Sequence, residues 1–113
     1  MSDIPTTEEL VRYLAVEGMG WTPSPTDPGY YYDKNGTRYF PQFGTDANDT
    51  EMLIEALARK GIPIAVMPDP NDGYVARNLK YYGPPRHNDS HADNMKTAVC
   101  HAAYMAIKAE KGL

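Results

Sequence analysis

The sequence predicts an α+β domain in which three amphipathic helices alternate with two β-hairpins. Helical spacing of apolar residues marks three segments. Between them lie an Asn-Gly turn flanked by aromatic residues and a Pro-Asp-Pro-Asn-Asp-Gly turn flanked by β-rich runs. The expected order is helix, hairpin, helix, hairpin, helix, with a small antiparallel sheet. Because the helices must bury their apolar faces against the sheet, we expect two or three packed layers. At 113 residues the chain should form a single domain, 1–113.

The first helix is expected over 7–17. Thr6 and Glu9 have the spacing of a capping box, and Pro5 prevents an earlier start. The apolar stripe of this helix is Leu10, Val11, Leu14 and Ala15, and the side expected to face water is Glu8, Glu9, Arg12 and Glu17. Gly18 should end the helix.

A proline-rich loop and an aromatic hairpin are expected next. Three prolines between Trp21 and Gly29 deny that stretch both helix and ladder hydrogen bonds, so we expect a loop anchored by Trp21. The segment 30–40 has Asn-Gly between aromatic and β-branched runs, which predicts a small hairpin. Pro41 indicates that its second strand is short or lies at an edge.

The second half predicts a helix, a hairpin and a last helix. Four candidate N-cap residues lie at 45–48, and Gly61 is the expected C′ residue of the helix that follows them. Strands are expected over 62–67 and 74–81. A polar loop over 83–93 should lead into a helix over 94–110. Asp93 is its expected N-cap, and its buried face is lined by small side chains such as Ala98, Ala102 and Ala106.

Composition limits the partners. The formal charge of −4, from 11 basic against 15 acidic residues, gives no electrostatic footprint for duplex nucleic acid or an anionic membrane. The N-terminus lacks the basic and apolar regions of an export signal, and no apolar run approaches the length of a membrane span. A single cysteine, Cys100, rules out an internal disulfide framework. We therefore expect a cytoplasmic protein.

Four segments together resemble the phage ABA sandwich domain family. They are Val16-Glu17-Gly18-Met19-Gly20-Trp21, the segment 45–60 followed by Gly61-Ile62-Pro63-Ile64, the strand 74–80, and the Ala-rich helix around 98–107. The resemblance covers nearly the whole chain and implies an α-β-α sandwich of phage or prophage origin. The family carries no catalytic motif, so no residue role is transferred. The tyrosine-rich hairpin 30–39 and the loop 83–93 depart from the family pattern, and such additions often carry function.

The loop 86–93 is the first candidate site. Arg86, His87 and His91 precede a helix N-terminus, where free amides and the helix dipole favour a phosphate, although Asp89 and Asp93 oppose an anion. The same imidazoles and carboxylates suit a transition metal, but structural zinc sites usually need thiolates. We therefore assign no metal and no cofactor, and a solvated loop stays the alternative.

The tyrosines are the second candidate site. Tyr30, Tyr32 and Tyr39 lie in one hairpin near Trp21, and a strand buries only alternate side chains, so the run 30–32 cannot all face one core. Exposed aromatic rings are typical of interface anchors and of platforms on which nucleobases stack. The alternative is that these rings cover a small sheet with their hydroxyls in water.

Two functional classes follow from these sites. The favoured one is a phage accessory protein that binds stoichiometrically and blocks or sequesters a host defence component, which is either a host protein or a small nucleotide-like ligand. The alternative is a small metal-dependent or acid-base enzyme built on the loop 86–93, and a phage structural or assembly protein is a third reading. Cys100 and His101 diverge on their helix, and no Gly-rich phosphate loop or hydrolase motif is present, so an enzyme is less favoured.

The aromatic hairpin leads to a first prediction. It carries more apolar area than a small hairpin can hide, so we expect the protein to form a homo-oligomer through it. Light scattering at high micromolar concentration should give the mass of an oligomer, and a strict monomer would contradict the expectation.

Overall fold

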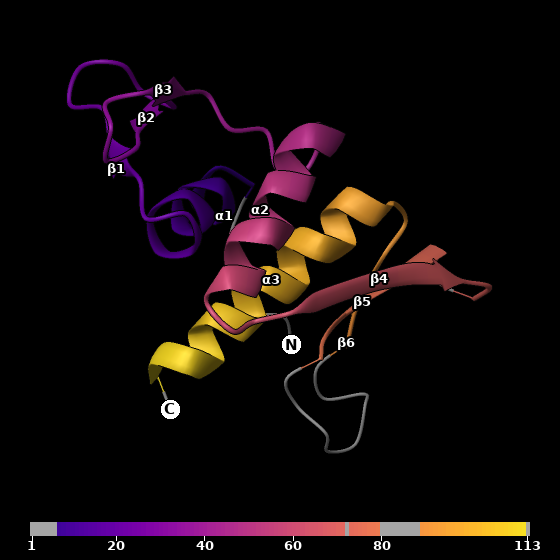
Figure 1. Ribbon diagram of the computed structural model, residues 1–113. Coiled ribbons are helices and arrows are strands. Elements are labelled where there is room, and N and C mark those ends of the chain that lie inside the picture. Colours follow the sequence, from indigo (N-terminus) through magenta and orange to yellow (C-terminus); the bar gives the residue numbers. More distant parts are fainter. Residues whose placement is uncertain (1–6, 72, 80–88, 113) are drawn as a thin grey trace.

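The computed structural model describes residues 7–71, 73–79 and 89–112 of the chain. Its elements follow one another as α1 (Thr7–Tyr13), the π-helix η1 (Leu14–Gly18), β1 (Thr22–Pro23), β2 (Tyr31–Tyr32), β3 (Arg38–Tyr39), α2 (Ala47–Arg59), β4 (Ile64–Asp69), β5 (Gly73–Asn78), β6 (Asp89–Ala92) and α3 (Met95–Gly112). Figure 1 shows the helices grouped together, with β1 to β3 on one side of them and β4 to β6 on another. The predicted α+β class and the alternation of helices and hairpins are confirmed.

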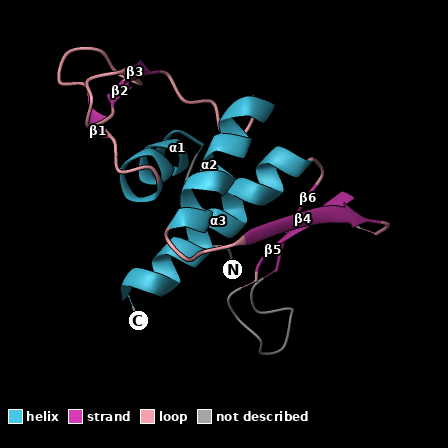
Figure 2. Ribbon diagram, viewed as in Figure 1, coloured by secondary structure: helices cyan, strands magenta, loops and turns pink. Residues whose placement is uncertain are grey.

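The second sheet has the order β4-β5-β6 and is antiparallel throughout. Its register aligns apolar side chains on one face of the sheet, and this face packs on the hydrophobic core. The residues are Ile64, Val66, Tyr74, Ala76 and Ala92. Helix α3 contacts all three of these strands and also contacts α1, η1 and α2, so it is the central helix of the fold. Figure 2 shows it between the other helices and this sheet.

Small side chains let α3 occupy that central place. Ala98, Ala102 and Ala106 are at most 3% exposed, as the sequence predicts. The N-cap is Asn94, whose side chain accepts a hydrogen bond from the Thr97 amide at 2.9 Å, so the prediction of Asp93 was wrong by one residue. Asn and Asp are nearly equal as N-caps, and adjacent candidates cannot be separated by propensity.

Helix α2 follows its sequence signals closely. Asp46 caps it by accepting hydrogen bonds from the amides of Asn48 and Asp49, and Gly61 adopts the positive φ expected just after its end. The Thr50 hydroxyl donates to the Phe43 carbonyl, which fastens the chain entering the helix to its first turns. The fully buried Leu53 and Leu57 place the helix on the common core.

The first helix differs from the expected uninterrupted helix over 7–17. It changes to a π-helix at Leu14, which carries Gly18 to the crossing with α2 and α3. A Cβ atom at Gly18 would lie 3.3 Å from the side chains of both Leu53 and Ile107. A side chain there would require both neighbours to shift by a few tenths of an ångström, a constraint that helical periodicity cannot reveal.

Two predicted loops contain strands. Thr22 and Pro23 pair with Tyr32 and Tyr31, although the prolines of 21–29 argued against any ladder. As an edge strand, β1 uses only one side of its backbone, and proline is tolerated there. The polar stretch 89–92 forms β6 on the free side of β5, because strand pairing is made by backbone groups that side-chain polarity does not report. The rest of the predicted loop 83–93 before it lies outside the described residues.

No helix in the described part of the chain combines the length and apolar character needed to cross a membrane.

A charge in the buried face of α3 should unfold the protein. Ala102 is 2% exposed, so we expect Ala102→Glu to lower the free energy of unfolding by about 3 kcal/mol or more, from overpacking and from burial of a carboxylate. Met105→Glu, on the same helix at a side chain that is 47% exposed, should leave the stability near that of the parent. Thermal melts of both variants test this, and equal melting temperatures would show that the buried face is assigned wrongly.

Candidate functional site

The small sheet β1-β2-β3 carries a stack of aromatic rings. The Trp21 ring lies parallel to the Tyr39 ring, with centroids 4.2 Å apart and an interplanar angle of 5°. Its other neighbour is Phe43, at 6.2 Å, a fully buried member of the core. Trp21 therefore anchors the aromatic sheet to the helices, as the sequence predicts.

Asp33 organises the turn that positions Tyr39. One carboxylate oxygen accepts from the amides of Asn35 and Thr37, at 2.8 and 2.9 Å, and the other accepts from the Tyr39 hydroxyl at 3.1 Å. The Asp33 amide donates to the Thr37 carbonyl and the Gly36 amide donates to the Asp33 carbonyl, so three residues, 34–36, form the loop, with a positive φ at Gly36. The hydrogen bond from the Thr37 amide is the largest cause of the lowered pKa of Asp33.

A second group of side chains on the same hairpin packs around Tyr30. The Arg38 guanidinium stands 4.0 Å from the centroid of the Tyr30 ring and 3.3 Å from the Asp27 carboxylate. Phe40 packs against Tyr30 with ring centroids 5.0 Å apart, yet its side chain stays 52% exposed. The half-exposed Phe40 is thus held in place by neighbours and still available to a ligand.

Alternation along β2 divides the three consecutive tyrosines. Tyr31 is 6% exposed, whereas Tyr30 and Tyr32 are half-buried. Burial raises the pKa of Tyr31, an effect that the nearby Arg12 partly offsets and Glu8 reinforces. The Tyr31 hydroxyl therefore keeps its proton at neutral pH and can donate a hydrogen bond.

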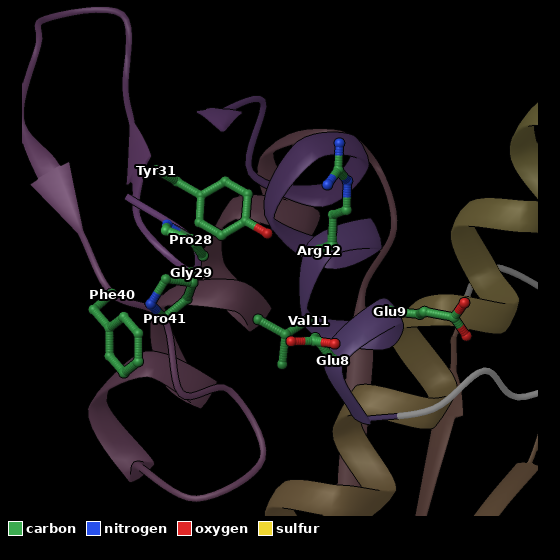
Figure 3. Close-up of a pocket in the computed structure, with 9 residues that line it drawn as sticks. All are labelled: Glu8, Glu9, Val11, Arg12, Pro28, Gly29, Tyr31, Phe40 and Pro41. Carbon is green, nitrogen blue, oxygen red and sulfur yellow. The ribbon is translucent and has the colours of Figure 1, made fainter. Parts of the chain in front are cut away.

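A cleft of about 670 Å³ separates α1 from the aromatic sheet. Figure 3 shows the nine residues that line it: Glu8, Glu9, Val11, Arg12, Pro28, Gly29, Tyr31, Phe40 and Pro41. A second hollow of about 310 Å³ continues along the same helix and shares Glu9 and Arg12 with the first. Its remaining lining consists of Tyr13, Val16, Glu17 and Pro23.

The predicted site residues fall into separate places. Trp21 and Tyr39 are stacked together, and Tyr30 packs against Phe40, but none of these three predicted residues lines the cleft. His91 lies in the other sheet, on β6, with its Nδ1 atom 3.4 Å from the Asp69 carboxylate. Arg86 and His87 lie outside the described residues. Within the described ranges, no three histidine, cysteine or acidic side chains meet in a geometry that could hold a metal ion.

The cleft residues Glu8, Arg12, Tyr31 and Phe40 were missed as a site. Glu8 and Arg12 are spaced i, i+4 on the side of α1 that periodicity assigns to water, and their proximity to Tyr31 arises only when the hairpin folds back over the helix. The spacing of the two charges was the one available signal.

The pair Cys100 and His101 offers no nucleophile. Burial raises the pKa of the Cys100 thiol to about 12, so the reactive thiolate is scarce at neutral pH. His101 is half-buried rather than a surface residue, and burial lowers its pKa.

The role of Asp33 predicts a pH-dependent stability. Its folded-state pKa lies below the ordinary value of 3.8, so the stability that the carboxylate contributes is present above that pH and is lost as the pH falls through the folded pKa. Thermal melts should show Asp33→Asn less stable than the parent at neutral pH, with the gap closing in acid. The variant should also lower the pKa of Tyr39, which the bond to Asp33 raises above 10.0. A stability gap that stays constant down to low pH would contradict this role.

Comparison with known proteins gives a likeness of fold. No family model matches the chain, and no curated protein matches it. A solved structure, the crystal structure of a phage protein from Bacillus cereus ATCC 14579, superposes with a TM-score of 0.69 at 13% sequence identity. The superposition covers 94% of this chain and 96% of that one. Membership in the phage ABA sandwich family stays an expectation, and the finding is that this chain shares the fold of a phage protein over 94% of its length.

Proposed function

We propose that this protein is a phage-encoded accessory protein that acts by stoichiometric binding, holding a component of the host cell in the cleft between α1 and the aromatic sheet. By binding that component, it would block or sequester part of the host defence in the host cytoplasm. The observation that carries the proposal is the cleft itself. Its volume of about 670 Å³ falls within the range of roughly 300–1,000 Å³ typical of ligand sites.

The construction of the cleft supports binding. Trp21 ties the aromatic sheet to the buried Phe43, and Asp33 fixes the turn behind it, so the walls are formed before a ligand arrives. A preformed site avoids the entropic cost of ordering side chains when the complex forms. The exposed Phe40 ring then provides apolar area that a ligand can cover.

The fold likeness supports the phage origin. The neighbour is itself a phage protein, and nearly all of both chains superposes, so the aromatic sheet and the helices belong to one shared architecture. That likeness transfers no target. The chemistry of the cleft must therefore guide the search for one.

Removal of the Phe40 ring should abolish capture of the target. We expect tagged parent protein, incubated with lysate of a bacterial host, to retain one target in equimolar amount, and Phe40→Ala to retain at most about a tenth of it, as for the loss of a central aromatic anchor. Met105→Ala is the matched control, since Met105 is 47% exposed on α3 and does not line the cleft. Mass spectrometry of proteins and of small molecules identifies what is retained.

Two results would contradict the proposal. One is equal retention of every captured component by the parent and by Phe40→Ala. The other is turnover of the captured molecule, because a stoichiometric binder leaves its ligand chemically unchanged.

A further inference from the structure

We infer that the two hollows along α1 form one groove that takes an extended peptide segment of a partner protein, in which a basic residue lies next to apolar ones. This inference rests on the proposed binding function and names the chemical class of its target. The groove is defined by the linings of the cleft and of the second hollow. Both linings include Glu9 and Arg12, so the two hollows border the same two side chains.

The length of the groove fits an extended chain. Its lining runs along α1 and η1 from Glu8 to Glu17, a rise of about 13 Å at roughly 1.5 Å per helical residue. About four residues of extended peptide cover that distance.

Apolar surface lies at both ends of the groove. Phe40, Pro41 and Val11 provide it in the cleft, and Val16 and Pro23 provide it in the second hollow. Successive side chains of an extended peptide point to opposite sides, so residues two apart can both face the groove. The Tyr31 hydroxyl, which keeps its proton, is available to donate to a peptide carbonyl.

The charge of the groove selects the peptide. Its lining includes three carboxylates, from Glu8, Glu9 and Glu17, and one guanidinium, from Arg12. The Lys60 ammonium donates to the Glu17 carbonyl at 3.2 Å, so with Lys60 counted the net charge is −1. Figure 3 shows Phe40 and Pro41 on the hairpin side of the cleft and Val11 and Glu8 on α1 across from them, with Glu9 pointing away from the hairpin. A lysine or arginine bound beside Glu8 would therefore enter the same cleft as the side chains that cover Phe40. Phosphate groups would meet repulsion from the carboxylates, which disfavours a nucleotide.

Paired charge variants test the inference. The probe is a random library of soluble heptapeptides, from which the immobilised parent protein enriches binders. We expect enriched peptides to carry lysine or arginine flanked by apolar residues, and their affinity to fall as salt rises. Glu8→Gln should weaken the enriched peptides about threefold, and Arg12→Gln, which removes the opposing cation and keeps a donor, should strengthen them about twofold.

Matched controls accompany these variants. Glu51→Gln and Arg59→Gln make the same changes at exposed positions on α2, outside the groove, and should leave the peptide affinity at the parent value. Circular dichroism checks that all four variants fold. Phe40→Ala should weaken the peptides about tenfold, whereas Met105→Ala should not.

Each other outcome overturns the inference. Enrichment of acidic or purely apolar peptides, equal binding by groove and control variants, or no enrichment would each reject a basic peptide as the occupant. A nucleotide from the lysate that binds more weakly to Arg12→Gln and more tightly to Glu8→Gln would also reject it, while leaving the proposed binding function intact. An oligomer in light scattering that Phe40→Ala dissolves, with no peptide bound, would assign this face to a second copy of the chain.

Discussion

The fold depends on the close packing of α3, a helix buried on most of its sides. It contacts the sheet β4-β5-β6 and also contacts α1, η1 and α2. Such a position requires short interaxial distances, which alanine allows and larger side chains prevent. The same requirement appears where η1 crosses α2 and α3, because Gly18 leaves no room for a Cβ atom without displacing Leu53 and Ile107. Small residues at these contacts are what permit a chain of this length to bury so many elements together.

The aromatic sheet depends on that core through few contacts. The Trp21 ring packs near Phe43, and the Tyr31 side chain on β2 is buried. The hydrogen bonds that shape the turn are made locally, by the Asp33 side chain. The strands themselves are two residues long, too short to hold a sheet by ladder bonds alone. Ring stacking and a charged turn residue therefore replace ladder length as the source of order. The walls of the cleft are accordingly rigid where Trp21 holds them and exposed where Phe40 projects.

Sequence reasoning predicted most of the elements and gave little signal for the cleft, for a physical reason. Helices such as α2 are predictable from local signals that do not depend on the rest of the fold. For α2 these signals are Asp46 at its start and Gly61 just after its end. The strands β1 and β6 gave no such signal, because their pairing is made by backbone groups of distant segments. The cleft depends even more on distance along the chain. Glu8 and Phe40 are separated by over thirty residues, and only the tertiary fold brings them to one cavity.

In a chain with a net charge of −4, the charges that select a partner are those that line the binding groove, because electrostatic selection depends on the local charges. Glu8 and Glu9 of α1 are exposed to solvent at the edge of apolar surface, and Coulomb interactions with them become stronger when a bound segment excludes part of the water. A basic side chain entering this groove would gain attraction from Glu8 while its neighbours cover the Phe40 ring and exclude more water. Apolar burial and charge pairing then reinforce each other. An anion in the same groove would gain apolar burial and would be repelled by the carboxylates. Arg12 limits the attraction for a basic side chain, since it places a cation in the lining that both hollows share.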